Sequence, residues 1–172
     1  MQHRAGSALV AIATLLVLSG WGTTSTQLAP GGRIGRMVLV RGTAATADQK
    51  LFDICDPIAG PGMSHRRCGL VPRVRKLFVG YGWFAPPRQI NAQWARLRWS
   101  AWLDGHRIQL AKFGTSDRTL FAFPPAGGKD VTLREWRVML IGATPGKHTL
   151  RYRTQVPKGA GDTTWAFTVA AR

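Results

Sequence analysis

The sequence predicts an all-β protein, an antiparallel β-sandwich of about seven strands with a long disulfide-tied loop. Three observations lead to this prediction. Apolar and polar residues alternate over several short segments, which is the period of a half-buried strand. Glycine, proline and Asp-Gly signals separate these segments at intervals of about 8–20 residues. After residue 30, no segment of the sequence shows the pattern of a helix of three turns.

The first 29 residues have the pattern of a secretory signal peptide. His3 and Arg4 supply a basic start, and an apolar run over residues 8–18 leads into small residues. The run is too short to span a bilayer comfortably, and no later stretch approaches a membrane-spanning length. We therefore expect an exported protein, secreted or periplasmic, whose residues 30–172 form a single domain. Cleavage after Gly22 or Thr26 fits the small-residue rule.

The first strand of that domain is expected at residues 36–41. Residues 43–72 are expected to be mostly an irregular loop, with a helical turn near residues 44–52. Strand-like residues follow at 74–83 and end at Pro86 and Pro87. Over residues 94–103 the alternation is clear, with Trp99 on the apolar face. Asp104 and Gly105 then predict a type I′ hairpin turn, because both turn positions require positive φ.

The second half of the chain continues the strand pattern. Residues 107–113 are the return strand of the hairpin, and residues 131–141 are expected to form another strand. Residues 147–156 alternate strictly, and residues 163–170 carry alternating aromatic residues. Short alternating strands with short connections favour two sheets packed face to face.

The last part of the chain resembles a known family. Its two motifs are ATPGKHTLRYRT at residues 143–154 and DTTWAFTV at residues 162–169. They are similar to the last two strands of exported bacterial immunoglobulin-like domains. The resemblance implies a sandwich that serves adhesion, spacing or binding, and it transfers no functional residue. The antibody-type Cys…Trp…Cys signature is missing, since Cys55 and Cys68 are too close in sequence to bridge the sheets in that manner.

The two cysteines of an exported chain predict a disulfide, Cys55–Cys68, which would close the irregular loop. A chemical alternative stays open at this point: Cys55, His65 and Cys68, with Asp53 or Asp56, would form a metal or catalytic thiol site. The spacing is not that of a zinc site. The sequence contains no nucleophile elbow, no phosphate-binding loop and no zinc-protease helix. Glu135 and Asp117 are the acids that no turn accounts for. We expect no catalytic residue, no metal and no cofactor.

Charge is the strongest compositional signal, with 24 Lys and Arg against 8 Asp and Glu, a net charge of +16. This charge either reflects an arginine-rich composition or attracts polyanions. The densest group of cations flanks the second cysteine and is the predicted anion-binding cluster. It comprises Arg66, Arg67, Arg73, Arg75 and Lys76.

A second candidate surface is aromatic. On the expected strand at residues 94–103, Trp94 and Trp102 share one face with Arg96 and Arg98. This face packs under a loop, or its arginines stack on the indoles as cation–π pairs, or it is a platform for a sugar ring or an anionic polymer.

The sequence therefore favours a non-catalytic binding or structural domain at the cell envelope, most simply a monomer, with a basic surface that contacts an anionic or glycan partner. A specific nucleic-acid motif is not seen. Two other functions stay open: a small exported enzyme or metal-dependent protein, and a scaffold that contacts only another protein.

Overall fold

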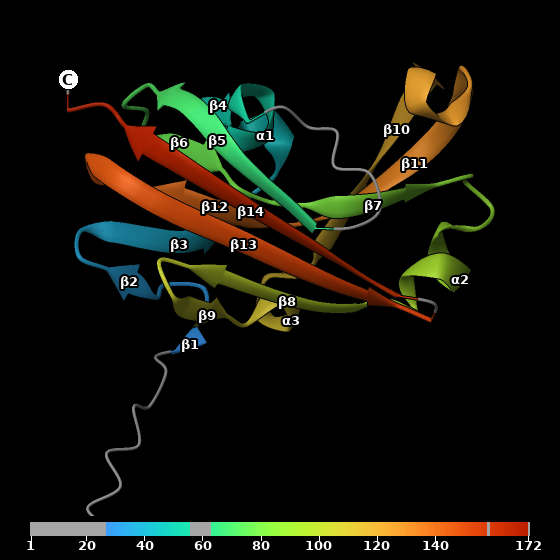
Figure 1. Cartoon of the computed structure of the whole chain (residues 1–172), viewed down its shortest axis with the longest axis horizontal. Coiled ribbons are helices and arrows are strands. Elements are labelled where there is room, and N and C mark those ends of the chain that lie inside the picture. Colours follow the sequence, from blue (N-terminus) through green and yellow to red (C-terminus); the bar gives the residue numbers. More distant parts are fainter. Residues whose placement is uncertain (1–26, 56–62, 158, 172) are drawn as a thin grey trace, which may run out of the picture.

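The structure is a computed structural model that describes residues 27–55, 63–157 and 159–171, and only the backbone of residues 63–67 (Figure 1). Most of the expected signal peptide lies outside the described residues. The described chain is mostly β and contains fourteen strands, several of them only two or three residues long. In the part of the chain that the structure describes, no helix has the length and apolar character needed to cross a bilayer.

One layer is a six-stranded sheet with the order β1-β9-β8-β13-β14-β5. Its centre is the antiparallel pair β13 and β14, which are joined in register from Gly146↔Val169 to Val156↔Gly159. Inward and outward residues alternate along both strands, as the sequence pattern requires. The bounds of its strands are β1 Gln27–Leu28, β5 Met63–Val71, β8 Arg98–Leu103, β9 His106–Ile108, β13 Gly146–Val156 and β14 Gly159–Val169.

The other layer is built from a five-stranded sheet, β2-β3-β12-β6-β4, and a three-stranded sheet, β10-β11-β7. The two are continuous along the chain, because only Arg137 separates β11 from β12. Gly82 allows β7 to approach β11 closely: a Cβ on Gly82 would lie 1.9 Å from the Arg134 carbonyl oxygen. The bounds are β2 Arg33–Ile34, β3 Met37–Arg41, β4 Gln49–Lys50, β6 Lys76–Phe78, β7 Gly82–Ala85, β10 Thr115–Phe123, β11 Lys129–Trp136 and β12 Val138–Ile141.

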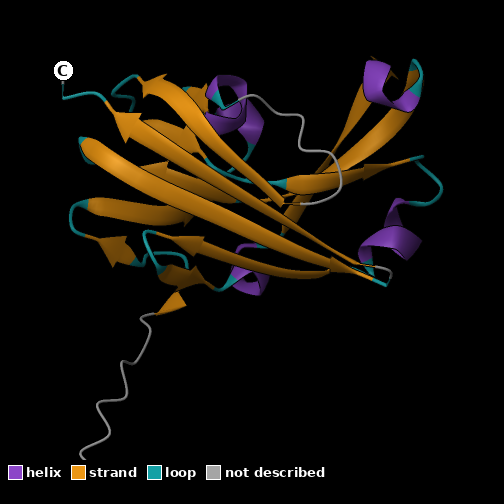
Figure 2. Cartoon of the chain, viewed as in Figure 1, coloured by secondary structure: helices purple, strands orange, loops and turns teal. Residues whose placement is uncertain are grey.

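Five short helical segments connect the strands (Figure 2). They are η1 Ala44–Thr46, α1 Leu51–Ile54, α2 Ile90–Trp94, α3 Leu110–Phe113 and η2 Pro124–Ala126. The η2 segment closes the β10–β11 hairpin, which extends away from the other strands at the upper right of Figure 2.

A single hydrophobic core lies between the six-stranded and the five-stranded sheets. Leu103 and Leu150 enter it from the first sheet, and Leu77 and Leu140 from the second, all fully buried. The layers are also joined by a hydrogen bond of 3.0 Å that the buried Tyr152 hydroxyl donates to the Val79 carbonyl. Burial of these side chains is the main source of stability for such a fold.

Several sequence expectations are confirmed. The Cys55–Cys68 disulfide is formed, and it ties α1 to β5. Asp104 and Gly105 have φ values of 49° and 80°, and they join β8 to β9 as the turn signal predicts. The strands predicted at 147–156 and 163–170 correspond to β13 and β14.

Other expectations need correction. The described residues form fourteen strands rather than about seven, and β1–β9, β14–β5 and β4–β6 are parallel pairs. Residues 43–72 contain the expected helical turn, as η1 and α1, but their described part also contains β4 and the nine-residue β5, so it is not mainly irregular. The expected strand at 107–113 ends at Ile108 and turns into α3. The sequence missed β5 and β10 because neither strand alternates clearly between apolar and polar residues.

The start of the domain also differs from the expected boundary after residue 29. Gln27 and Leu28 form β1, which pairs with β9, and the Leu28 side chain is buried in the core. The described fold therefore begins before residue 30, and only cleavage at or before Thr26 would leave it intact.

Candidate functional site

Of the five residues of the predicted basic cluster, the structure describes the side chains of Arg73, Arg75 and Lys76. The side chains of Arg66 and Arg67 lie outside the described residues, although their backbone belongs to β5 of the six-stranded sheet. Lys76 is in β6 of the other layer, where its backbone N–H donates to Asp48 over 2.8 Å. Arg73 donates to the Ala171 carbonyl, and Arg75 is exposed.

The predicted aromatic platform is also divided. Trp94 ends α2, and hydrogen bonds such as Gln93 N–H to the Gln89 carbonyl, 2.9 Å, give this segment helical rather than extended geometry. Arg96 follows the helix, and the strand β8 begins only at Arg98. Trp102 and Arg98 remain on the outward side of β8, since Ala101 and Leu103 face the core. The platform therefore loses Trp94 and Arg96.

The outward side of the six-stranded sheet carries a different set of cations, contributed by three neighbouring strands. We call this surface the basic face. It consists of Arg98 on β8, Arg107 on β9, and Lys147, Arg151 and Arg153 on β13. All five side chains are exposed.

The other described side chains of the basic face are mostly small and uncharged. At the described outward positions of β8, β9, β13 and β14, the one acid is Asp162. It accepts hydrogen bonds from both Nε and a terminal nitrogen of Arg151, and these bonds and the carboxylate charge raise the pKa of Arg151. The neighbouring outward residues on β14 are Thr164, Ala166 and Thr168, which leave the sheet surface flat.

Trp102 lies in the middle of the basic face between two arginines. It is directly opposite Arg151 on β13 and Arg107 on β9. The Arg151 guanidinium carbon lies 5.2 Å from the centre of the Trp102 ring, within the range of a cation–π contact. One hypothesis from the sequence is that arginines stack on the indoles of this face. Such a contact is present on Trp102, but its arginine, Arg151, comes from β13 and not from the strand that carries Trp102.

A cleft of about 400 Å³ adjoins the basic face at the edge of β8. We call it the tryptophan cleft, because Trp94, Trp99 and Trp136 line it. Trp94 stacks on Trp99 with ring centres 5.2 Å apart and also lies 5.2 Å from Trp136. The polar residues of the cleft are Gln27, Ser100, Arg107 and Gln109.

Two of the tryptophans that line the cleft carry a buried hydrogen-bond donor. Nε1 of Trp99 and Nε1 of Trp136 are buried, and neither has a hydrogen-bond partner among the described residues. A buried donor without a partner costs about 1–3 kcal/mol, so native proteins rarely keep two of them together. A contribution to stability therefore does not explain the two unpaired donors of the cleft tryptophans.

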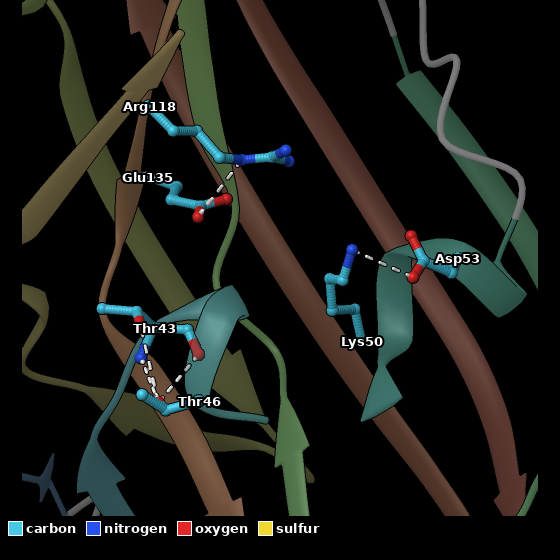
Figure 3. Close-up of polar contacts among 6 residues, drawn as sticks. All are labelled: Thr43, Thr46, Lys50, Asp53, Arg118 and Glu135. Atoms are coloured by element: carbon cyan, nitrogen blue, oxygen red, sulfur yellow. Dashed lines mark hydrogen bonds and ion pairs between the residues drawn. The ribbon is translucent and has the colours of Figure 1, made fainter. Parts of the chain in front are cut away.

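The remaining acids mostly form ion pairs. Glu135 is buried on β11, and its carboxylate lies 3.7 Å from Arg118 (Figure 3). Burial raises the pKa of Glu135, against the opposing effect of Arg118 and Lys50. Asp117 forms a two-bond pair with Arg134 at 2.7 and 2.6 Å. The two acids that the sequence left unexplained are therefore partners of arginines.

In the structure Cys55 and Cys68 are joined in a disulfide, and a disulfide-bonded cysteine is neither a thiolate ligand nor a nucleophile. The His65 side chain lies outside the described residues. Among the residues that are described, no three His, Cys, Asp or Glu side chains gather in a group that could hold a metal ion.

The sequence matches no protein-family model and no curated protein. A search of solved structures finds the solution structure of amebosin, which is 12% identical to this chain. The match covers 64% of this chain and 100% of that one, with a TM-score of 0.27.

Proposed function

We propose that this protein is an exported, non-catalytic binding domain of the cell envelope whose basic face binds an anionic polymer. The observation that carries this proposal is the basic face itself. Five exposed cations and one acid, already paired, lie on a flat sheet surface. Such a surface attracts polyanions by releasing their counterions, and it needs no bond chemistry.

We further propose that the domain is an immunoglobulin-like β-sandwich. In that fold one sheet contains strands C, F and G, and the other contains B, E and D. The pairings β8–β13–β14 and β6/β7–β11/β12, with β10 beside β11, follow this scheme in chain order. The parallel strand β5 then borders the last strand, β14. Trp99 occupies the strand that carries the core tryptophan in such domains.

Export is supported by the signal-like N-terminus and by the disulfide, since disulfides persist in oxidising compartments. Because Leu28 is buried, we expect the mature chain to begin no later than Gln27. N-terminal sequencing of the protein recovered from outside the cytoplasm tests this directly. A mature chain that begins at Pro30 or later would contradict β1 as part of the fold.

A salt titration tests the binding proposal. The purified protein would be titrated with polyphosphate from about 50 to 200 mM salt, a range over which multi-contact binding to polyanions weakens steeply. The double variant Arg98→Gln/Arg153→Gln is expected to make the slope of log affinity against log salt less steep, by the amount that about two phosphate contacts contribute. The double variant Arg33→Gln/Arg36→Gln is the charge-matched control: it removes two exposed cations, from β2 and from the β2–β3 turn, and should change binding little. Equal slopes for wild type and the double variant would refute the basic face.

A scaffold function is the second candidate, favoured by the hairpin that projects from the other strands. Phe121 is 76% exposed near the tip of the hairpin, and Phe84 on the neighbouring strand β7 is 43% exposed. Ala122 has a φ of 45°, which turns the chain at the point where the β10–β11 register shifts. An apolar hairpin tip suits a protein partner, and binding through it would depend weakly on salt.

A further inference from the structure

We propose that the tryptophan cleft holds one ring of an acidic glycan, so that the polymer on the basic face is a uronic-acid polysaccharide. This inference rests on the proposed function and names its ligand class. It depends on three observations: the position of the cleft, the composition of its walls and the unpaired indole donors.

The position of the cleft makes it continuous with the basic face. Strand β9 pairs with β8 only from Ala101 to Leu103, so the cleft occupies the space where β9 would otherwise continue beside Trp99 and Ser100. Ser100 lies opposite Arg153, and Arg107 both belongs to the basic face and lines the cleft. A chain held on the basic face therefore reaches the cleft without leaving the protein surface.

The walls of the cleft match a sugar ring. A pyranose has apolar C–H faces that stack on indole rings and hydroxyl groups around its edge that need polar partners. Three indoles provide the first, while the Ser100 hydroxyl and the Gln27 and Gln109 amides provide the second. The two amides are already oriented, since Gln109 Nε2 donates to Gln27 Oε1 over 2.9 Å. The volume lies within the range of small-molecule sites.

The charge of the cleft indicates an acidic sugar rather than a neutral one or a nucleic acid. Arg107 is the cation that lines it, and no acid faces it from the lining residues that the structure describes. A guanidinium binds a carboxylate through two parallel hydrogen bonds. One cation beside two amides and a hydroxyl suits a hydroxyl-rich ring with one carboxylate, whereas a phosphodiester chain would require several cations at this point.

The unpaired donors give the cleft a reason to bind. Nε1 of Trp99 and of Trp136 are enclosed by neighbouring side chains, and Trp94 packs on both rings. Trp94, carried by the five-residue α2, packs against both rings, and we infer that its displacement by a bound sugar would open the way to these donors. A hydroxyl oxygen of the sugar would then accept the hydrogen bonds that the free protein does not make.

The test compares three probes of similar charge: oligogalacturonate, polyphosphate and oligo(dT). Affinity would be measured by calorimetry, and tryptophan fluorescence would report contact with the cleft. Trp94→Ala and Arg107→Gln are expected to weaken oligogalacturonate binding about tenfold or more. The same two variants should weaken polyphosphate binding less than about threefold, because at most one cation of the basic face is lost. Arg36→Gln is the charge-matched control, and Arg107→Gln, an exposed residue, keeps the test valid if Trp94→Ala does not fold.

Each failure has its own signature. Oligogalacturonate affinity that neither Trp94→Ala nor Arg107→Gln lowers would overturn the cleft and leave the basic face standing. Loss of oligo(dT) binding as large as the loss of oligogalacturonate binding would overturn the sugar assignment. Binding of all three probes that does not depend on salt, and that Arg98→Gln/Arg153→Gln does not change, would instead overturn the proposed function.

Discussion

The molecule contains two aromatic clusters that touch but differ in how their polar atoms are treated. The inner cluster consists of Phe52, Tyr81, Tyr152 and Trp165, and the edge cluster consists of Trp94, Trp99 and Trp136. Tyr81 packs on Trp99 at 6.0 Å and so joins the two. In the inner cluster the Tyr152 hydroxyl has its acceptor, whereas in the edge cluster two indole donors have none.

This difference shows what each cluster contributes. The inner cluster packs against the core, where the buried Tyr152 and Trp165 rings and the Tyr152 hydrogen bond stabilise the fold. The edge cluster lies where β9 leaves the sheet, borders an open cleft and keeps unfavourable buried donors. Mutations in the inner cluster should therefore lower stability, and mutations in the edge cluster should mainly lower binding.

The largest expected effect is on Trp165. Its side chain is 2% exposed, so Trp165→Ala should lower the free energy of unfolding by about 3–5 kcal/mol. Trp94→Ala, at a half-buried position, should cost less than about 2 kcal/mol. Urea unfolding followed by circular dichroism measures both. The comparison fails if the two variants lose equal stability.

The next largest effect on stability is expected from the disulfide. It lies beside the inner cluster, because it ties α1, whose Phe52 packs on Trp165. The double variant Cys55→Ala/Cys68→Ala should lose about 3 kcal/mol of stability, because the unfolded chain regains the freedom of the closed loop. Polyphosphate affinity should not change under folding conditions. A binding defect in the folded variant would mean that the disulfide also shapes the binding surface.

A smaller effect is expected from the hydroxyl of Tyr152. Tyr152→Phe removes the hydrogen bond to the Val79 carbonyl and leaves that acceptor buried, at a cost of about 1–1.5 kcal/mol. Burial raises the pKa of this hydroxyl well above its usual range, so it stays protonated in the folded protein. Chemical denaturation of the two proteins at equal ionic strength gives the difference. A neutral substitution would remove the contrast between satisfied and unsatisfied polar atoms.

The smallest effect is a pH dependence from Glu135. Its pKa is raised by burial above the ordinary value of 4.5, so the unfolded chain releases this proton at lower pH than the folded protein does. The contribution of Glu135 to stability must then fall as pH rises from about 4.5 through the raised pKa, and it stays low above it. Glu135→Gln should remove this slope, so that the variant gains stability over the wild type as pH rises towards neutrality. Thermal melts across this range test the sign. A stability difference that is constant with pH would contradict the raised pKa.

How far the sequence could predict the structure depends on the kind of signal. Strands β8, β13 and β14 were predictable because one side of each is buried, which makes polarity alternate along the chain. The β8–β9 turn was predictable because Asp104 and Gly105 adopt a backbone that few other residues tolerate. Strand β5 gave no such signal, because its residues do not alternate clearly between apolar and polar, and only its pairing with β14 makes it a strand of the sheet.

The candidate site was less predictable than the fold. Trp102 and Arg98 were correctly placed on one face, but Trp94 was not, because α2 replaces the first residues of the expected strand. The basic face needed the strand order, since alternation shows which side of β13 is outward but not that β8 and β13 are neighbours. Trp136 could be linked to Trp99 only by the packing of the two layers.

The sequence by itself determined the β-rich class, the disulfide, the hairpin turn and the large positive charge, because each depends on residue type and local spacing. The tertiary structure alone decided which cations share a surface and which tryptophans meet at its edge. The physical reason is that pairing and packing join segments whose separation along the chain carries no local signal. The basic face and the tryptophan cleft are both products of that assembly.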